Sequence, residues 1–495
     1  MSVEVQLMLT PLEQFRNTIY AWFPHRADAL MELLDALSSN QTARSVVELS
    51  LNPCFRRQYG SLHDGIAHLF SASEGQTCLP EYELSQERKV LLGLLVSFLP
   101  PPQKRFRLLG IDVTSASRPF AKTLADRTFV YQPNPVKGVK PITIGHQYSV
   151  LAVLPDKAHL AEPPWILPLL VDRVPSREAK RATGLAQLTH VLDDPALPFS
   201  QELGVQVVDS DYSAVTYQGP VASRPNLVTI TRLPGNRTVY RPAPPLPEGL
   251  KRPRGHPTWF GAAMRLKAPE TWEEPDEVAT TTLRTRKGQR YTVQLEGWHE
   301  LLRRGTRAQP MQKYPFTLVR ARVLDDKGQP VFTRPLWLTV IGPRRRELSL
   351  VDIWEAYRQR YDLEHYFRFG KQRLLMEAYQ TPNTTYEEQW WTVVQLAYWQ
   401  LWLARDLATQ MPRPWERYLP RFKTPPDTQR PDVASSPVVS PSPSDVQRDM
   451  ARIIRQCGTP ARIPKPRGKS PGRSPGQRPG KRIRHPVIKK SKHGS

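Results

Sequence analysis

Apolar residues recur at helical spacing through the first hundred residues of the chain. Two sets have this spacing: Leu30, Leu33, Leu34 and Leu37, and then Val90, Leu91, Leu94 and Leu95. Residues three and four positions apart share one face of a helix. The pattern predicts a helical N-terminal domain over residues 1–100, and the prolines at 100–102 mark its boundary.

Between residues 105 and 240, continuous apolar runs replace the helical pattern. Phe106–Thr114 contains Asp112, and Gly204–Tyr212 contains Asp209, each directly after an apolar stretch. Such runs are typical of buried central strands. Residues 128–132, 146–154 and 226–233 are further strand candidates, and residues 176–192 are expected to form a helix. The region therefore predicts an α/β domain with an acid at the end of its first and fourth strands.

Residues 241–335 interrupt this arrangement with a β-rich insertion. The segment begins with several prolines and continues with alternating apolar and polar residues at 290–295 and 317–324. Alternation with a period of two indicates strands that are half buried. Asp325–Gly328 has turn composition, and the apolar run at 334–341 returns the chain to the core.

A long helix is expected after Ser349, which together with Asp352 forms a capping-box pattern. Four residues of this helix, Tyr357, Arg360, Glu364 and Lys371, are separated by three, four and seven positions. At about 100° per residue they fall within an arc of roughly 60°. Such a face is compatible with ordinary solvated charges. It is also compatible with a carboxylate that holds a metal beside cations that grip phosphates.

The charge of the chain indicates a polyanionic partner. The 495 residues carry a net charge of +24, and residues 461–495 contribute twelve Lys/Arg and no acid. Nucleic acid is the expected partner. Residues 411–495 are rich in proline and serine and are expected to form a mostly disordered basic tail, with a short helix near 446–457.

Other site classes have little support in the sequence. Cys54, Cys78 and Cys457 form no CxxC pair, so neither a zinc site nor a disulfide framework is indicated. The N-terminus lacks the pattern of a secretion signal. Residues 384–387 resemble a helix cap. The apolar run 390–407 that follows contains four tryptophans and also charged residues, and the charges favour a buried helix over a membrane span. A cytoplasmic protein is expected.

The spacing Tyr-x2-Arg-x3-Glu-x6-Lys resembles the signature of the YREK-type DDE transposases of bacterial insertion sequences, the insertion-sequence-four superfamily. Here it consists of Tyr357, Arg360, Glu364 and Lys371. The resemblance implies an RNase H-like core in two parts, residues 105–240 and 336–410, separated by the insertion at 241–335. It leaves two roles open for residues 1–100: binding of the element's DNA ends, or a helical cap on the core.

The resemblance also implies the chemistry. Asp112, Asp209 and Glu364 would hold two Mg²⁺ ions, with Mn²⁺ as a substitute, and cleave DNA phosphodiesters. Asp211 is a rival to Asp209, which we prefer because it directly follows the apolar strand and precedes Tyr212 as in the family pattern.

Further residues are expected to contact DNA. Tyr357, Arg360 and Lys371 are expected at the phosphate backbone. Trp298, or else Trp259, is a candidate to stack on a flipped base, although a tryptophan packed in the core of the insertion is the commoner case.

The predicted function is DNA cleavage and strand transfer for an insertion sequence. The partners are double-stranded DNA, as terminal inverted repeats and target, and a second copy of the chain. A nucleoid-associated bacterial protein is expected. The alternatives are an RNase H-like nuclease or resolvase, and a DNA-binding protein that has lost catalysis.

Overall fold

The computed structural model describes residues 10–71, 83–132, 140–157, 162–245, 259–285, 288–410, 440–466, 476, 480 and 482–489. Its strands are β1 Arg107–Ser117, β2 Thr128–Tyr131, β3 Ile142–Val153, β4 Leu167–Val174, β5 Gly204–Val208, β6 Leu227–Arg232, β7 Thr238–Pro242, β8 Phe260–Arg265, β9 Glu277–Arg284, β10 Arg290–Leu301, β11 Phe316–Leu324 and β12 Leu336–Ile341. Its α-helices are α1 Pro11–Trp22, α2 Ala27–Ser38, α3 Tyr59–Ala67, α4 Gln86–Ser97, α5 Lys180–Asp193, α6 Val215–Ala222, α7 Leu350–Gln359, α8 Tyr361–Arg373, α9 Thr384–Gln410 and α11 Pro443–Cys457.

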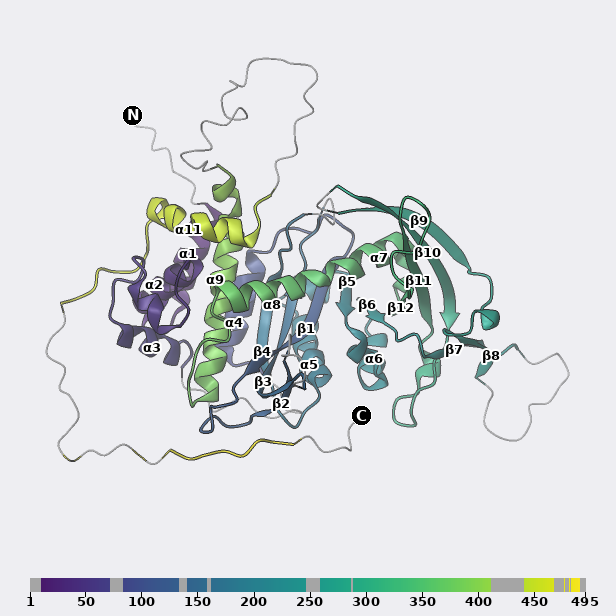
Figure 1. Ribbon diagram of the computed structural model, residues 1–495, viewed down its shortest axis with the longest axis horizontal. Helices are drawn as coiled ribbons and strands as arrows, with labels where there is room; N and C mark the ends of the chain where they lie inside the picture. Colours follow the sequence, from purple (N-terminus) through teal and green to yellow (C-terminus); the bar gives the residue numbers. More distant parts are fainter. Residues whose placement is uncertain are drawn as a thin grey trace, which may run out of the picture.

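One large mixed sheet organises the molecule (Figure 1). Its strands follow the order β2-β3-β1-β5-β6-β12-β11-β10-β9, and β4 also pairs with β3. The β1–β5 and β5–β6 pairs are parallel, whereas β1–β3 and all pairs beyond β6 are antiparallel. This mixed α/β architecture is consistent with a DDE nuclease fold.

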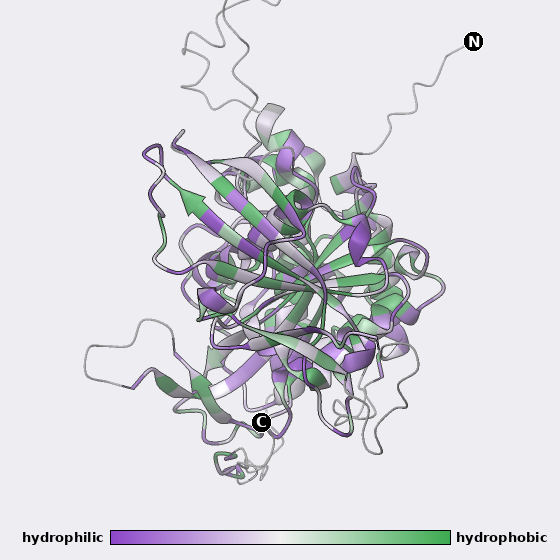
Figure 2. Ribbon diagram, turned by 90° about the vertical axis from the view of Figure 1, so that its right-hand side faces the viewer, coloured by the Kyte–Doolittle hydropathy of each residue, from purple (hydrophilic) through white to green (hydrophobic). Residues whose placement is uncertain are grey.

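The β-rich segment extends the core sheet. Strand β12 pairs with β6 from Leu338↔Arg232 to Ile341↔Thr229, and β11, β10 and β9 follow in turn. Figure 2, in which the side carrying β7–β11 faces the viewer, shows apolar residues concentrated in the strands at the centre of the ribbon. The sequence pattern predicted strands here, but it did not predict that they share a sheet with the core.

Helices pack on both faces of the sheet at β1. A Cβ on Gly110 would lie 2.9 Å from Leu363 of α8, and a Cβ on Gly184 of α5 would lie 3.1 Å from Ile111. Because neighbouring strand residues point to opposite faces, α8 and α5 cover opposite sides of β1. Glycine at these two positions lets both helices approach the sheet closely.

The N-terminal helices pack against α9 and join the main core. Helices α1, α2 and α3 all contact α9, and the rings of Phe15 and Trp399 are stacked at 6.4 Å. The expected buried helix is therefore α9, whose Trp390, Trp391, Trp399 and Trp402 are all buried. No helix in the described ranges is long and apolar enough to cross a membrane.

Several expectations change in detail. Strand β4 was missed, so Asp209 follows the fifth strand rather than the fourth. The expected single helix after Ser349 is divided into α7 and α8, although Arg360 between them keeps helical angles. The cap of α9 is Asn383, whose Oδ1 accepts the amide of Thr385 at 2.8 Å. Thr384 and Glu387 therefore do not form the expected cap.

The C-terminal segment contains described structure. Helix α11 buries Val446, Met450 and Ile453 against α9 and α2. Ile488 reaches the start of β2: its amide donates to Arg127 O at 2.8 Å, and it forms an isolated bridge with Thr128. The structure does not describe residues 411–439 and most of residues 467–481, so the expectation of disorder there stays a prediction. Cys78 also lies outside the described residues.

Candidate active site

Two aspartates lie side by side because of strand register. In the parallel pair, Arg107 is opposite Gly204 and Gly110 is opposite Val207. Asp112 and Asp209 each lie two residues beyond that last pair, so they occupy equivalent positions. Their charges interact, since Asp209 helps to raise the pKa of Asp112. The structure thus brings together two carboxylates that are 97 residues apart in sequence.

Helix α8 brings the third carboxylate. The capping box forms as expected, with Ser349 Oγ accepting the amide of Asp352 at 3.1 Å. The close approach of α8 to β1 at Gly110 then places Arg360 within reach of Asp112 and Glu364. Its guanidinium donates to Asp112 at 3.0 Å and to Glu364 at 3.1 Å. Arg360 therefore bridges two of the three expected site residues.

Burial makes Asp112 an unusual carboxylate. Desolvation raises its pKa to about 6. Arg360 opposes this increase and Asp209 adds to it. A buried anion beside another anion is costly without a cation, which explains why Arg360 lies where it does.

Lys180, at the first position of α5, is a site residue that the sequence interpretation missed. Its Nζ lies 3.6 Å from Asp209 and 2.5 Å from Asp211. Although burial lowers the pKa of Lys180, Asp209 and Asp211 outweigh that effect and raise it. No sequence motif distinguishes this lysine, because its partners are about 30 residues away.

Asp209 and Asp211 differ in what they contact. Asp209 Oδ1 accepts the amide of Asp211 at 2.9 Å, which fixes the carboxylate at the end of β5. Asp211 is more exposed and is the closer partner of Lys180. These contacts favour Asp209 as the inward-facing acid.

The remaining two signature residues flank this centre. Tyr357 is 8% exposed, and the guanidinium of Arg360 lies 5.8 Å from its ring centre. Burial raises the pKa of its phenol. Lys371 donates to Ser115 O at 2.7 Å and pairs with Glu377. Helix α8 continues through Gly370 as far as Arg373, so Lys371 remains on the helix.

The two tryptophans have opposite environments. Trp298 is 2% exposed, its indole donates to Glu273 O at 2.9 Å, and its ring lies 5.9 Å from that of Trp337. In this conformation it offers no face to a DNA base, because it packs in the core of the β extension. Trp259 is 44% exposed.

The sequence profile of the DDE superfamily endonucleases matches residues 18–300, more than half of the chain. The chain belongs to this family. The match includes Asp112 and Asp209 and ends before Glu364. No curated protein matches the sequence. DNA is the substrate class that this family implies, and its members typically use divalent metals.

The donors of this endonuclease suit a hard divalent cation. Carboxylate oxygens are the ligands that Mg²⁺ prefers, and the charge of Asp209 helps to raise the pKa of Asp112. Among the described residues, no group of three or more His, Cys, Asp and Glu lies ready to hold an ion. Arg360 and Lys180 instead neutralise the acids, so an ion that binds here must displace them.

A groove beginning at Arg360 extends over the β extension of the endonuclease. We call it the arginine groove because five of its lining residues are Arg232, Arg322, Arg334, Arg358 and Arg360. It has a volume of about 660 Å³, and Phe332 and Tyr357 also line it. Sequence reasoning missed all of these residues except Tyr357 and Arg360, because they come from four separate segments.

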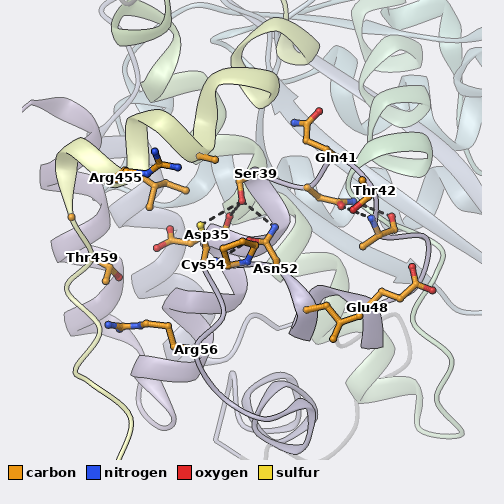
Figure 3. A pocket seen from close by; sticks show the side chains of 17 residues that line it. Asp35, Ser39, Gln41, Thr42, Glu48, Asn52, Cys54, Arg56, Arg455 and Thr459 are labelled. Carbon is orange, nitrogen blue, oxygen red and sulfur yellow. Dashed lines mark hydrogen bonds between the residues drawn. The ribbon is translucent and has the colours of Figure 1, made fainter.

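Another pocket, about 790 Å³, lies elsewhere in the described structure (Figure 3). It is between the end of α2, the loop to Cys54 and helix α11. Asp35 at its base is already bonded to Arg16 and Gln400. None of the three candidate catalytic acids lines it, so we do not assign the active site there.

Proposed function

We propose that this DDE endonuclease is the transposase of an insertion sequence and belongs to the YREK group. The observation that carries the proposal is the convergence of Asp112, Asp209 and the Glu364 helix around Arg360. This convergence joins three segments that the resemblance had named separately.

The proposed core is RNase H-like. Its five strands, in the order β4-β3-β1-β5-β6, would carry the first two acids on the adjacent strands β1 and β5. Strands β9, β10 and β11 would then belong to the family's insertion, which joins the core where β11 pairs with β12 and β12 pairs with β6. The final acid comes from α8, beyond that insertion.

The roles of the acids follow from their positions. Asp112 lies between Asp209 and Arg360 and would contact both metal ions, while Asp209 and Glu364 would each hold one. Two bound Mg²⁺ ions would supply an activated nucleophile and neutralise the leaving oxygen. Arg360 and Lys180, once displaced from the carboxylates, are positioned to neutralise phosphate oxygens of the DNA.

Positioning of DNA would depend on the same face of α8. Tyr357, Arg360 and Lys371 would contact the backbone of the terminal inverted repeat, and the arginine groove would continue that surface. Strand transfer additionally requires target DNA, and we expect a homodimer in the DNA complex.

A cleavage assay tests the proposal. DNA carrying the sequences that flank the gene is incubated with the protein and Mg²⁺, Mn²⁺, Ca²⁺ or EDTA, and both cleavage and joining are measured. Asp112→Asn, Asp209→Asn and Glu364→Gln should each reduce cleavage by at least about 1,000-fold. Binding in EDTA should persist, because backbone contacts do not require metal.

Two comparisons sharpen this test. Asp211→Asn should lower cleavage but not abolish it, whereas Asp193→Asn, an exposed acid of α5 paired with Arg224, should not affect it. Cleavage without joining would indicate a nuclease or resolvase. DNA binding without any metal-dependent cleavage would indicate a protein that has lost catalysis, and either result would refute the transposase proposal.

A further inference from the structure

A second cationic hollow lies where the N-terminal helices meet the end of α8. We call it the junction cleft; its volume is about 530 Å³. Its cations are Arg44, Lys371 and Arg373, and its amide side chains are Asn40, Gln41 and Gln372. No acidic residue lines it. Three cations and three amides without an acid are suited to an anion such as phosphate.

Two of the cations are unengaged in the described structure. Arg44 and Arg373 are exposed, and neither guanidinium forms a salt bridge with a described residue. Glu48 interacts with Arg44: its carboxylate accepts the Arg44 backbone amide at 2.7 Å, and the charge of Arg44 contributes to lowering its pKa. Lys371 does have a partner, Glu377. The cleft therefore has unneutralised charge at its rim.

Buried polar side chains fix the walls of the cleft. Asn40, 5% exposed, accepts the amide of Ala43 at 2.9 Å and donates to Arg373 O at 3.3 Å. Gln447 of α11, 2% exposed, also donates to Arg373 O at 3.3 Å. Three separate segments are thus tied together, so the backbone at Arg373 and the loop that leads to Arg44 are held in place before a ligand arrives.

The cleft continues the candidate active site. Lys371 donates to Ser115 O, three residues beyond Asp112 on β1. It also lies seven residues after Glu364, which is about 10 Å along α8. That distance corresponds to roughly three nucleotides of one DNA strand. This continuity favours a nucleic-acid backbone over a free anion.

We propose that the junction cleft binds the sugar–phosphate backbone of the DNA that leads away from the active site. The N-terminal helices then contribute to DNA binding through the loop 40–44, by phosphate contacts and without reading bases. The inference rests on the proposed function, since it uses DNA at the carboxylates as its starting point.

Salt-dependent binding tests the inference on the full-length protein. A random-sequence duplex is titrated in EDTA over a series of NaCl concentrations. Loss of one phosphate contact lowers the slope of log K against log salt by about 0.9. Arg44→Gln and Arg373→Gln should each lower the slope by about one, and the double variant by about two. Each single variant should bind roughly tenfold more weakly at 0.1 M salt.

Lys89→Gln is the matched control, because Lys89 is exposed on α4 and lies outside the cleft. Its slope should equal that of the wild type. Thermal unfolding of each variant should be unchanged, since both arginines are exposed. A double variant with the wild-type slope overturns the inference. A second result would also overturn it. Inorganic phosphate would raise the melting temperature of the wild type but not of the double variant, while both proteins give the same slope with DNA.

The outcome is separable from that of the proposed function. Binding in EDTA does not depend on cleavage. If the wild type cleaves DNA normally but the variants keep the wild-type slope of log K against log salt, only the proposal for the junction cleft is refuted. The predicted slopes without any cleavage would refute the catalytic proposal alone.

Discussion

Lys180 occupies a position that its own helix disfavours. It is the first residue of α5, where the partial positive charge of the helix N-terminus repels a cation. The first turn of α5 has no acidic residue to compensate. Asp209 and Asp211 supply that compensation instead. At the scale of single residues, Lys180 and Arg360 thus neutralise the acids of the candidate site.

Removing Lys180 should therefore strengthen metal binding. In Lys180→Met, Asp209 loses a competing cation, and an ion pair of this partly exposed kind is worth about 1 kcal/mol. We expect the affinity for Mn²⁺, measured by electron paramagnetic resonance without DNA, to rise about fivefold. Lys180→Arg should keep the wild-type affinity, as should Lys89→Met. An unchanged affinity in Lys180→Met would show that Lys180 does not compete for the carboxylate.

At the scale of elements, a buried ion cluster joins α9 to β3 and to the end of β1. Glu387 is fully buried and contacts Arg118 at 2.7 Å, His146 at 2.5 Å and Tyr148 at 3.0 Å. Arg118 also donates to Glu377 O at 2.9 Å, which holds the turn that carries the partner of Lys371. The cluster therefore links the end of β1 and strand β3 to the end of α8.

The cluster predicts a pH dependence of stability. Burial raises the pKa of Glu387, but the hydrogen bond with His146 and the charge of Arg118 outweigh it and hold the pKa below its ordinary value of 4.5. A depressed pKa stabilises the fold above the unfolded-state value, and this stability is lost as the pH falls through the folded-state pKa. The melting temperature should decline once the pH drops below about 4.5.

Glu387→Gln measures that contribution. At pH 7 the variant should be destabilised by about 3–5 kcal/mol, because Arg118 is left buried without its anion. The difference in melting temperature from the wild type should shrink as the pH falls through the depressed folded-state pKa of Glu387, because the wild-type carboxylate then gains a proton. Glu347→Gln, at an exposed pair with Arg344, should have little effect. A difference that is constant with pH would contradict the assignment.

At the scale of the whole molecule, the C-terminal segment both carries positive charge and contacts the folded part of the chain. Residues 461–495 carry twelve of the cations that give the chain its net charge of +24. The segment also contacts the fold, because Arg56 donates to Ala461 O at 3.0 Å and Ile488 donates to Arg127 O at 2.8 Å. The tail thus both carries charge and contacts the chain at the start of β2.

Two variants separate these roles. Deleting residues 467–495 removes ten Lys/Arg, the twelve of the tail less Arg462 and Lys465. A second variant keeps the backbone and replaces with glutamine the seven cations outside 482–489, namely Arg467, Lys469, Arg473, Arg478, Lys481, Lys490 and Lys492. Both should weaken binding to a random duplex at low salt, with a deficit that shrinks as salt rises.

Stability should distinguish the two variants. The deletion should lower the melting temperature, because the segment before β2 loses the backbone hydrogen bonds from His485 to Lys122 and from Ile488 to Arg127. The glutamine variant should not lower it. Equal DNA affinities at low salt would show that the tail has no role in binding.

The sequence by itself determined many of the elements and singled out the candidate acids. Periodicity and apolar runs predicted α2, α4, β1, β5, β6, β10 and β11, because burial on one face or on both faces of an element is encoded in neighbouring residues. The same runs singled out Asp112 and Asp209, and fixed spacing on one helix singled out Tyr357, Arg360, Glu364 and Lys371. These patterns are local, so a single chain reveals them.

Only the tertiary structure decided how distant segments meet. Residue patterns do not specify strand partners, so the sequence could not show that β12 pairs with β6 or that Asp112 and Asp209 share a register. Glu387 looked like a capping residue and is a buried ion pair, because its partners lie about 240–270 residues away. Lys180 and Arg44 were missed for the same reason: what a charged side chain does depends on the charges that folding places beside it.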